Sequence, residues 1–229
     1  MLMGSRSSIP FDRIQGWFFD LDGTLMDTDD QTVDKLAVRI RGLGPSASRR
    51  FARWLVMTSE TPGNAALTVM DALRLDRMVF QVKDRLSQGT APTFRLIDGV
   101  TPLLVNLARD ARLAIVSTRT QGAAQAFLEQ HTLVALFDLV VTQETTDRLK
   151  PHPEPILYAA ETLGLAPDTC VMVGDTPVDI RSARRAGAWA VGVLCGFGRE
   201  AELRRAGAHL IVPSTADLLD LLRIGEQAT

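Results

Sequence analysis

Residues 17–27 read Trp-Phe-Phe-Asp-Leu-Asp-Gly-Thr-Leu-Met-Asp, an apolar run that ends abruptly in acidic residues. The run Trp17-Phe18-Phe19 is typical of a short apolar strand. Asp20 and Asp22 follow on a turn that contains Gly23, so both carboxylates can face a ligand over the strand end. Such a pair suits a nucleophile beside a proton-transfer group, although an acidic turn without function has the same composition.

From residue 96 onward, short apolar runs alternate with longer helical stretches, the pattern of βαβ units. We therefore predict an α/β fold with a Rossmann-like three-layer core around a parallel sheet. Several expected strands end in a polar residue, and ligands bind outside the carboxyl ends of parallel strands. The expected strands are Trp17–Phe19, Leu113–Val116, Leu139–Val141, Val171–Val173, Ala190–Val193 and Leu210–Val212.

Between the first strand and the second, the pattern changes to helical periodicity with few strand signals. We interpret residues 28–94 as a small all-helical cap domain inserted after the first strand. Residues 1–27 and 95–229 then form the α/β core domain. The two linkers of such an insertion would lie side by side over the carboxyl edge of the sheet, which suits a lid.

The composition is that of a soluble globular protein, with 229 residues, 46% of them hydrophobic, and a net charge of -2. No basic stripe stands out, and no apolar run reaches the ~20 residues of a spanning helix, so we expect neither a nucleic-acid nor a membrane partner. Cys170 and Cys195 lie in apolar, strand-like stretches, which predicts buried free thiols and a cytoplasmic protein. The oligomeric state has no signature in the sequence.

Four motifs resemble, in order, those of the haloacid dehalogenase superfamily, specifically its phosphatases with a helical cap after the first strand. The first motif matches residues 20–27. The second, a Ser or Thr that ends the next core strand, matches Ser117. The third, a lysine ahead of a Pro-x-Pro run, matches Lys150, and the fourth, Gly-Asp with a second Asp one helical turn on, matches Asp175 and Asp179.

The resemblance implies that Asp20 is the nucleophile and Asp22 the general acid and base. Ser117 and Lys150 would complete the catalytic set, because a carboxylate and a phosphate dianion repel each other unless donors and positive charge compensate. Considered alone, Ser117 could simply form a turn and Lys150 could be a solvated surface lysine.

The resemblance also implies Mg²⁺ as the cofactor. Its ligands would be the side chains of Asp20 and Asp175 and the backbone carbonyl of Asp22, with Asp179 holding a metal-bound water. A few carboxylates with waters and a substrate phosphate meet the octahedral preference of Mg²⁺. Asp179 could instead only complement the dipole of the helix that it begins.

The predicted function is hydrolysis of a small phosphorylated metabolite, because Asp22 argues against dehalogenation within the superfamily. Residues 192–208 look most like phosphoglycolate phosphatases, which makes phosphoglycolate the first candidate. Two alternatives stay open, a sugar phosphomutase of the same superfamily and a non-hydrolytic phosphate-binding or phospho-aspartate signalling protein.

Substrate choice should reside in the insertion. Arg49 and Arg50 are candidates for binding a substrate carboxylate or second phosphate, although a solvated helix face has the same pattern. Thr118, beside Ser117, is a further candidate for substrate binding.

Overall fold

Six parallel strands form one sheet in the computed structural model, which describes residues 9–27 and 94–226. Their order is β3-β2-β1-β4-β5-β6, so β1 lies inside the sheet between β2 and β4. All the expected strands are confirmed to within one residue at each end. The strands are β1 Gly16–Phe19, β2 Arg112–Val116, β3 Leu139–Val141, β4 Cys170–Gly174, β5 Trp189–Val193 and β6 Leu210–Val212.

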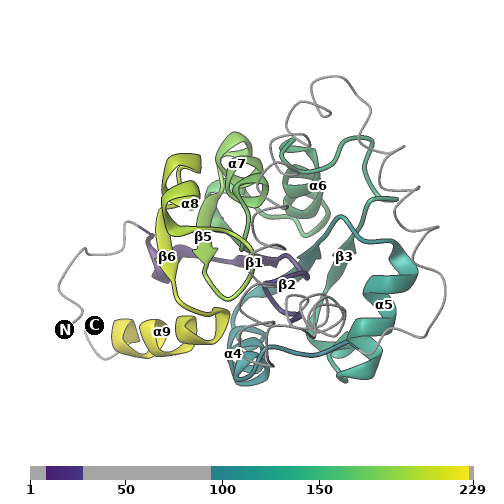
Figure 1. Ribbon diagram of the computed structural model, residues 1–229, viewed down its shortest axis with the longest axis horizontal. Helices are drawn as coiled ribbons and strands as arrows, with labels where there is room; N and C mark the ends of the chain where they lie inside the picture. Colours follow the sequence, from purple (N-terminus) through teal and green to yellow (C-terminus); the bar gives the residue numbers. More distant parts are fainter. Residues whose placement is uncertain (1–8, 28–93, 227–229) are drawn as a thin grey trace, which may run out of the picture.

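Helices cover both faces of the sheet and make the three layers that the sequence predicts (Figure 1). One face packs against α6, α7 and α8, and the other against α4, α5 and α9. The α-helices of the described residues are α4 Val100–Leu107, α5 Gln121–Gln130, α6 Glu154–Thr162, α7 Pro177–Ala186, α8 Glu200–Ala206 and α9 Leu218–Glu226. Short 3₁₀ helices are η1 Phe11–Arg13, η3 Val134–Leu136, η4 Pro167–Thr169 and η5 Thr215–Asp217.

The side chains of β1 alternate between two cores, because successive residues of a strand point to opposite faces. Trp17 and Phe19 join the cluster beneath α4, α5 and α9, whereas Phe18 joins the cluster beneath α6, α7 and α8. All three rings are buried. β1 therefore carries no polar side chain, and Asp20 is the residue that directly follows its end.

The two chain segments that flank the proposed cap lie side by side. Met26 pairs with Leu96 in an antiparallel bridge, and the Asp27 N–H donates to the Arg95 carbonyl at 2.8 Å. The two segments on either side of residues 28–94 are thus adjacent, as expected, while the division into a core and a cap stays a prediction. The cap itself, proposed for residues 28–94, lies outside the described residues apart from its last residue.

The two cysteines are free thiols with different surroundings. Cys170 begins β4 and is buried, as expected. Cys195 is only partly buried and lies beyond β5, so its prediction as a buried strand residue is wrong. β5 ends at Val193, opposite Val212, the last residue of β6, and the chain then turns into a loop.

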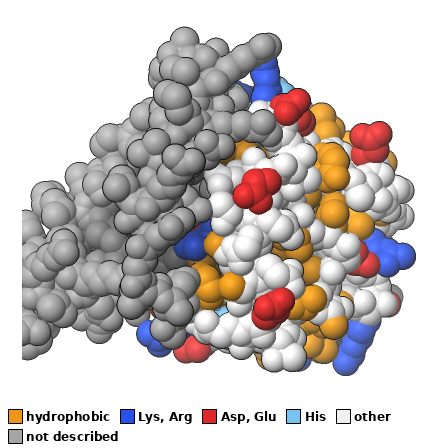
Figure 2. Space-filling view, turned by 90° about the vertical axis from the view of Figure 1, so that its right-hand side faces the viewer, with side chains coloured by type: hydrophobic (Ala, Val, Ile, Leu, Met, Phe, Trp, Pro, Cys, Tyr) orange, Lys and Arg blue, Asp and Glu red, His pale blue; other side chains and the backbone are white. Residues whose placement is uncertain are grey.

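Charged side chains are dispersed on the face shown in Figure 2. There, acidic and basic side chains of the described residues are scattered, and neither sign gathers in one patch. Within residues 9–27 and 94–226, no helix combines the length and the apolar composition needed to cross a membrane.

Leu104 and Val105 allow a matched test of the core, because these neighbours on α4 are 0% and 42% exposed. Leu104→Ala should lower the free energy of unfolding by about 2–5 kcal/mol, since it leaves a cavity. Val105→Ala should change it by less than about 0.5 kcal/mol. Urea unfolding followed by circular dichroism measures both values, and equal effects would contradict the packing of α4 against the sheet.

Candidate active site

Three neighbouring strands bring polar side chains to one edge of the sheet. Asp20 follows β1, Ser117 follows β2 and Asp175 follows β4. The parallel register aligns Phe19, the last residue of β1, with residues near the ends of both neighbours. The carboxyl edge therefore collects one candidate side chain from each strand, as the sequence predicts.

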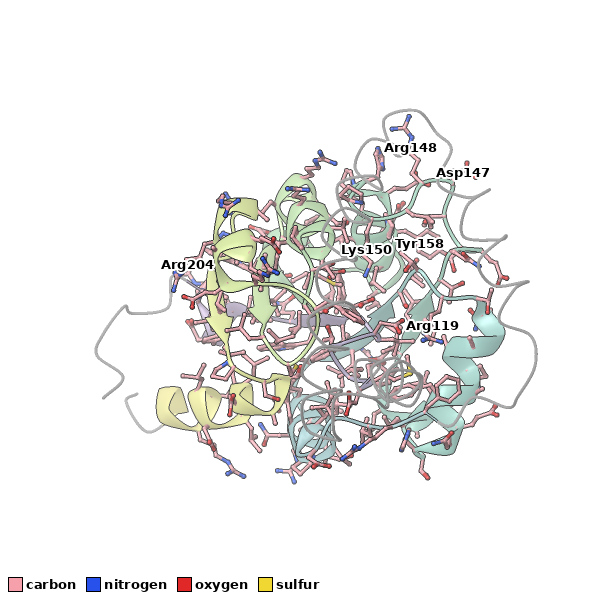
Figure 3. The ribbon with its side chains drawn as sticks, viewed as in Figure 1. Arg119, Asp147, Arg148, Lys150, Tyr158 and Arg204 are labelled. Carbon is pink, nitrogen blue, oxygen red and sulfur yellow. The ribbon has the colours of Figure 1, made fainter. Side chains whose placement is uncertain are left out.

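Lys150 is buried at this edge and bridges two carboxylates. Its Nζ donates to Asp20 Oδ1 at 2.8 Å, to Asp179 Oδ1 at 2.5 Å and to the Val116 carbonyl at 2.8 Å. These bonds use all three ammonium donors, and the side chain is 3% exposed. Figure 3 shows Lys150 in the interior, at the start of the chain segment that leads into α6. Lys150 is therefore a fixed part of the site and not a solvated surface lysine.

Helix α7 holds the lysine and its loop. Asp179 lies in the first turn of α7, and its Oδ1 accepts the hydrogen bond from Lys150. Its Oδ2 accepts from the N–H of Thr176 at 3.1 Å and from the Thr176 hydroxyl at 2.5 Å. The bond from the Thr176 N–H is one half of a capping box, and the other half joins the Asp179 N–H to the Thr176 side chain, so Asp179 both caps the helix and binds the lysine. Ser182 Oγ donates to the carbonyl of His152, two residues beyond Lys150, at 2.7 Å.

Asp175 is buried with only one of its oxygens satisfied. Oδ2 accepts from the Phe197 N–H at 2.7 Å, whereas Oδ1 has no hydrogen-bond partner among the described residues. Gly23 and Gly196 border the carboxylate so closely that a Cβ would lie 2.8 Å and 2.6 Å from its carboxyl carbon. Gly23 also has a φ of 69°, which disfavours other residues. Two glycines therefore let the surrounding loops close on Asp175.

The cluster carries more negative charge than Lys150 neutralises. Burial raises the pKa of Asp20 to about 7, and the carboxylates of Asp179 and Asp22 act in the same direction, against Lys150. Burial, together with Asp179 and Asp20, also raises the pKa of Asp175 well above its ordinary value. Burial alone would lower the pKa of Lys150, but the negative charges of Asp179 and Asp20 have the larger combined effect and raise it.

This cluster fits a small divalent cation with oxygen ligands, such as Mg²⁺. Asp20, Asp175 and Asp179 each offer an oxygen, and these atoms lie within 4.8 Å of one another. The clearest sign is Asp175 Oδ1, because a buried carboxylate oxygen without a donor is costly unless a cation compensates it. The predicted metal ligands Asp20 and Asp175 thus lie together, while the Asp22 carbonyl as a ligand and Asp179 as the holder of a water stay predictions.

Asp22 forms a bidentate ion pair with Arg119, a residue to which no motif pointed. Arg119 Nε donates to Asp22 Oδ2 and Nη2 donates to Oδ1, both at 2.6 Å. Arg119 follows Ser117 by two residues in the loop between β2 and α5, where Figure 3 labels it. Its place just after a strand end is the sequence signal that could have indicated it.

Of the four remaining candidates, the structure describes Ser117 and Thr118 but not the two arginines. Ser117 is buried, and its Oγ accepts from the Arg119 N–H at 3.2 Å, which leaves the hydroxyl hydrogen for a ligand. Thr118 is partly exposed in the same loop. Arg49 and Arg50 lie outside the described residues, so their role in substrate binding stays a prediction.

Changing Asp175 to Asn should raise the thermal stability of the protein in a chelator, because it removes one of three clustered negative charges. The same change should abolish or greatly reduce the rise in Tm that Mg²⁺ gives the unaltered protein by binding the native state. Thermal denaturation with and without Mg²⁺ measures both effects. An undiminished Mg²⁺ response in the variant would show that Asp175 is not a ligand.

Comparison with known proteins gives a consistent family assignment. The family model of the haloacid dehalogenase-like hydrolases matches residues 17–193. A Dickeya dadantii protein described as "Probable phosphatase IndB" is 32% identical over 88% of this chain and 90% of its own. A Photorhabdus laumondii phosphoglycolate phosphatase is 28% identical, covering 89% of this chain and 90% of its own.

A solved structure, a hydrolase from Pseudomonas syringae, superposes with a TM-score of 0.65 at 28% identity. It covers 91% of this chain and 98% of its own. The region that the family model matches begins in β1 and ends with β5, so it includes all four motifs. The chain therefore belongs to the haloacid dehalogenase-like hydrolases and is a phosphatase of that family.

Proposed function

We propose that this phosphatase hydrolyses small phosphomonoesters with Mg²⁺ and through a phosphorylated Asp20. The observation that carries the proposal is the buried Lys150 ammonium, bound to Asp20 and Asp179 beside the unsatisfied oxygen of Asp175. This arrangement holds Asp20 at the carboxyl edge of the sheet, the edge at which parallel sheets bind their ligands.

In the first step, an Asp20 oxygen attacks the phosphorus, and the bond from phosphorus to the leaving oxygen breaks. Asp22 gives its proton to that oxygen, so an alcohol departs. Lys150 fixes the orientation of Asp20 and partly offsets the repulsion between carboxylate and phosphate, while the Ser117 hydroxyl donates to a phosphoryl oxygen. Bound Mg²⁺ would supply further positive charge beside the phosphate.

In the second step, a water attacks the phosphorus of the aspartyl phosphate. Asp22, now a carboxylate, accepts a proton from this water. The bond between phosphorus and Asp20 breaks, so inorganic phosphate leaves and both aspartates return to their starting forms. The covalent intermediate replaces one difficult displacement by two easier ones.

For the substrate we propose a small phosphorylated metabolite, with phosphoglycolate as the first candidate. Two observations support this choice, the likeness of residues 192–208 to phosphoglycolate phosphatases and the name of the Photorhabdus relative. Specificity would depend on Arg49 and Arg50, because arginine binds carboxylates and phosphates bidentately.

Asp20→Asn should lower the turnover of para-nitrophenyl phosphate by roughly 10³-fold or more, because the nucleophile is lost. The assay measures phosphate release with and without Mg²⁺. Asp138→Asn is the matched control, since Asp138 pairs with Arg112 at the other end of β2. Near-normal turnover in Asp20→Asn would refute the nucleophile, and the absence of metal-dependent release from the unaltered protein would favour a binding or signalling protein.

A screen of phosphorylated metabolites should find substrates with a second anionic group turned over most efficiently. In the double variant Arg49→Ala, Arg50→Ala, KM for these substrates should rise by about 10-fold or more, the effect of losing a hydrogen bond to a charged group. KM for para-nitrophenyl phosphate, which has no second anion, should stay the same. A parallel change in both KM values would contradict recognition of a second anion by these arginines.

A further inference from the structure

Arg119 is held in place by contacts of both its side chain and its backbone. Its guanidinium donates to both oxygens of Asp22 at 2.6 Å, and its backbone N–H donates to Ser117 Oγ at 3.2 Å. The guanidinium carbon lies 5.8 Å from the centre of the Phe94 ring, within the range of a cation–π contact. A long side chain with this many restraints is ordered before any substrate binds.

Phe94, which supports the guanidinium, is itself fixed on α5. Its ring packs edge-on against Phe127 at a centroid distance of 5.9 Å. Gln130 accepts from the Phe94 N–H at 3.3 Å and donates to the Phe94 carbonyl at 2.6 Å. The support for Arg119 therefore runs back to a helix of the core, so its position is rigid.

Folding stability does not explain the ion pair between Asp22 and Arg119. Their side chains are 32% and 29% exposed, and partly exposed pairs contribute little to folding because solvent screens them. The bidentate geometry instead fixes the plane of the carboxylate as well as its place, which a point charge such as lysine cannot do. The loop of Arg119 also carries Ser117, so Asp22 is positioned relative to the hydroxyl proposed to bind the phosphoryl group.

We infer that Arg119 is a positioning residue, which orients the Asp22 carboxyl for proton transfer to and from the reacting oxygens. The inference rests on the proposed function, in which Asp22 is the acid and base. Asp22 precedes Gly23 in a tight turn and is partly exposed, so without Arg119 its side chain is free to adopt other rotamers. Arg119 acts through Asp22 and not by binding the substrate.

The test compares Arg119→Met with the unaltered protein on two substrates. One is the alkyl phosphate turned over fastest in the metabolite screen, whose leaving oxygen needs a proton. The other is para-nitrophenyl phosphate, whose leaving group departs without one. Arg119→Met should lower kcat on the alkyl phosphate by roughly 10- to 100-fold, as expected for a misplaced catalytic group. KM should stay nearly constant, the loss on para-nitrophenyl phosphate should be smaller, and Arg119→Lys should restore only part of kcat.

Two controls separate positioning from other roles. In an Asp22→Asn background, Arg119→Met should change turnover of para-nitrophenyl phosphate by less than about 2-fold, because the group it positions is gone. Arg112→Met removes an arginine–aspartate pair at the opposite end of β2 and should leave kcat unchanged. A crystal structure of Arg119→Met should show the Asp22 carboxylate reoriented or in several rotamers.

Three results would overturn the inference. They are a rise in KM at constant kcat, an Arg119→Met effect that persists in the Asp22→Asn background, and an unchanged Asp22 orientation in the crystal structure of the variant. Full activity of Asp22→Asn on the alkyl phosphate would remove the proposed acid and base itself. That failure of the proposed function is visible without any change at Arg119.

Discussion

Repulsion between buried carboxylates is the constraint on which the site depends. The parallel sheet delivers Asp20 and Asp175 to one edge, and α7 adds Asp179. Lys150 binds two of these three groups and is fixed in turn by α7. One ammonium cannot neutralise three carboxylates, so the cluster retains negative charge, and Asp175 Oδ1 finds no hydrogen-bond partner in the part of the chain that the structure describes. A divalent cation relieves that charge and at the same time brings positive charge to a bound phosphate.

Asp20 and Asp22 are only two residues apart, but they have different partners. Asp20 binds the buried Lys150, whereas Asp22 binds the partly exposed Arg119. The nucleophile we propose is thus held by a buried cation, whereas the proposed acid and base is partly exposed and held by a partly exposed one. This division of partners gives two chemically identical side chains different roles within a single turn.

The sequence predicts the sheet well, because each strand is a short apolar run with a polar end. It also predicts that Asp20, Ser117 and Asp175 meet at one edge, since the ends of neighbouring parallel strands lie together. Lys150 was predicted only from its resemblance to a family motif, because it lies in the loop between β3 and α6 and not at a strand end. Arg119 escapes prediction because the aspartate that it pairs with is 97 residues away in the chain. The prediction of Cys195 as a buried thiol was wrong, because the apolar residues around it continue past the end of β5 into a loop where its side chain is only partly buried.

A crystal structure of the protein soaked with Mn²⁺, whose anomalous signal identifies it, tests the central claim most directly. The account predicts one ion at the carboxyl edge of the sheet, bound by a side-chain oxygen of Asp20 and by the unsatisfied Oδ1 of Asp175. Lys150 should keep its contact with Asp179 in the presence of the ion. An ion bound elsewhere, or Asp20 and Asp175 too far apart to share it, would contradict the account.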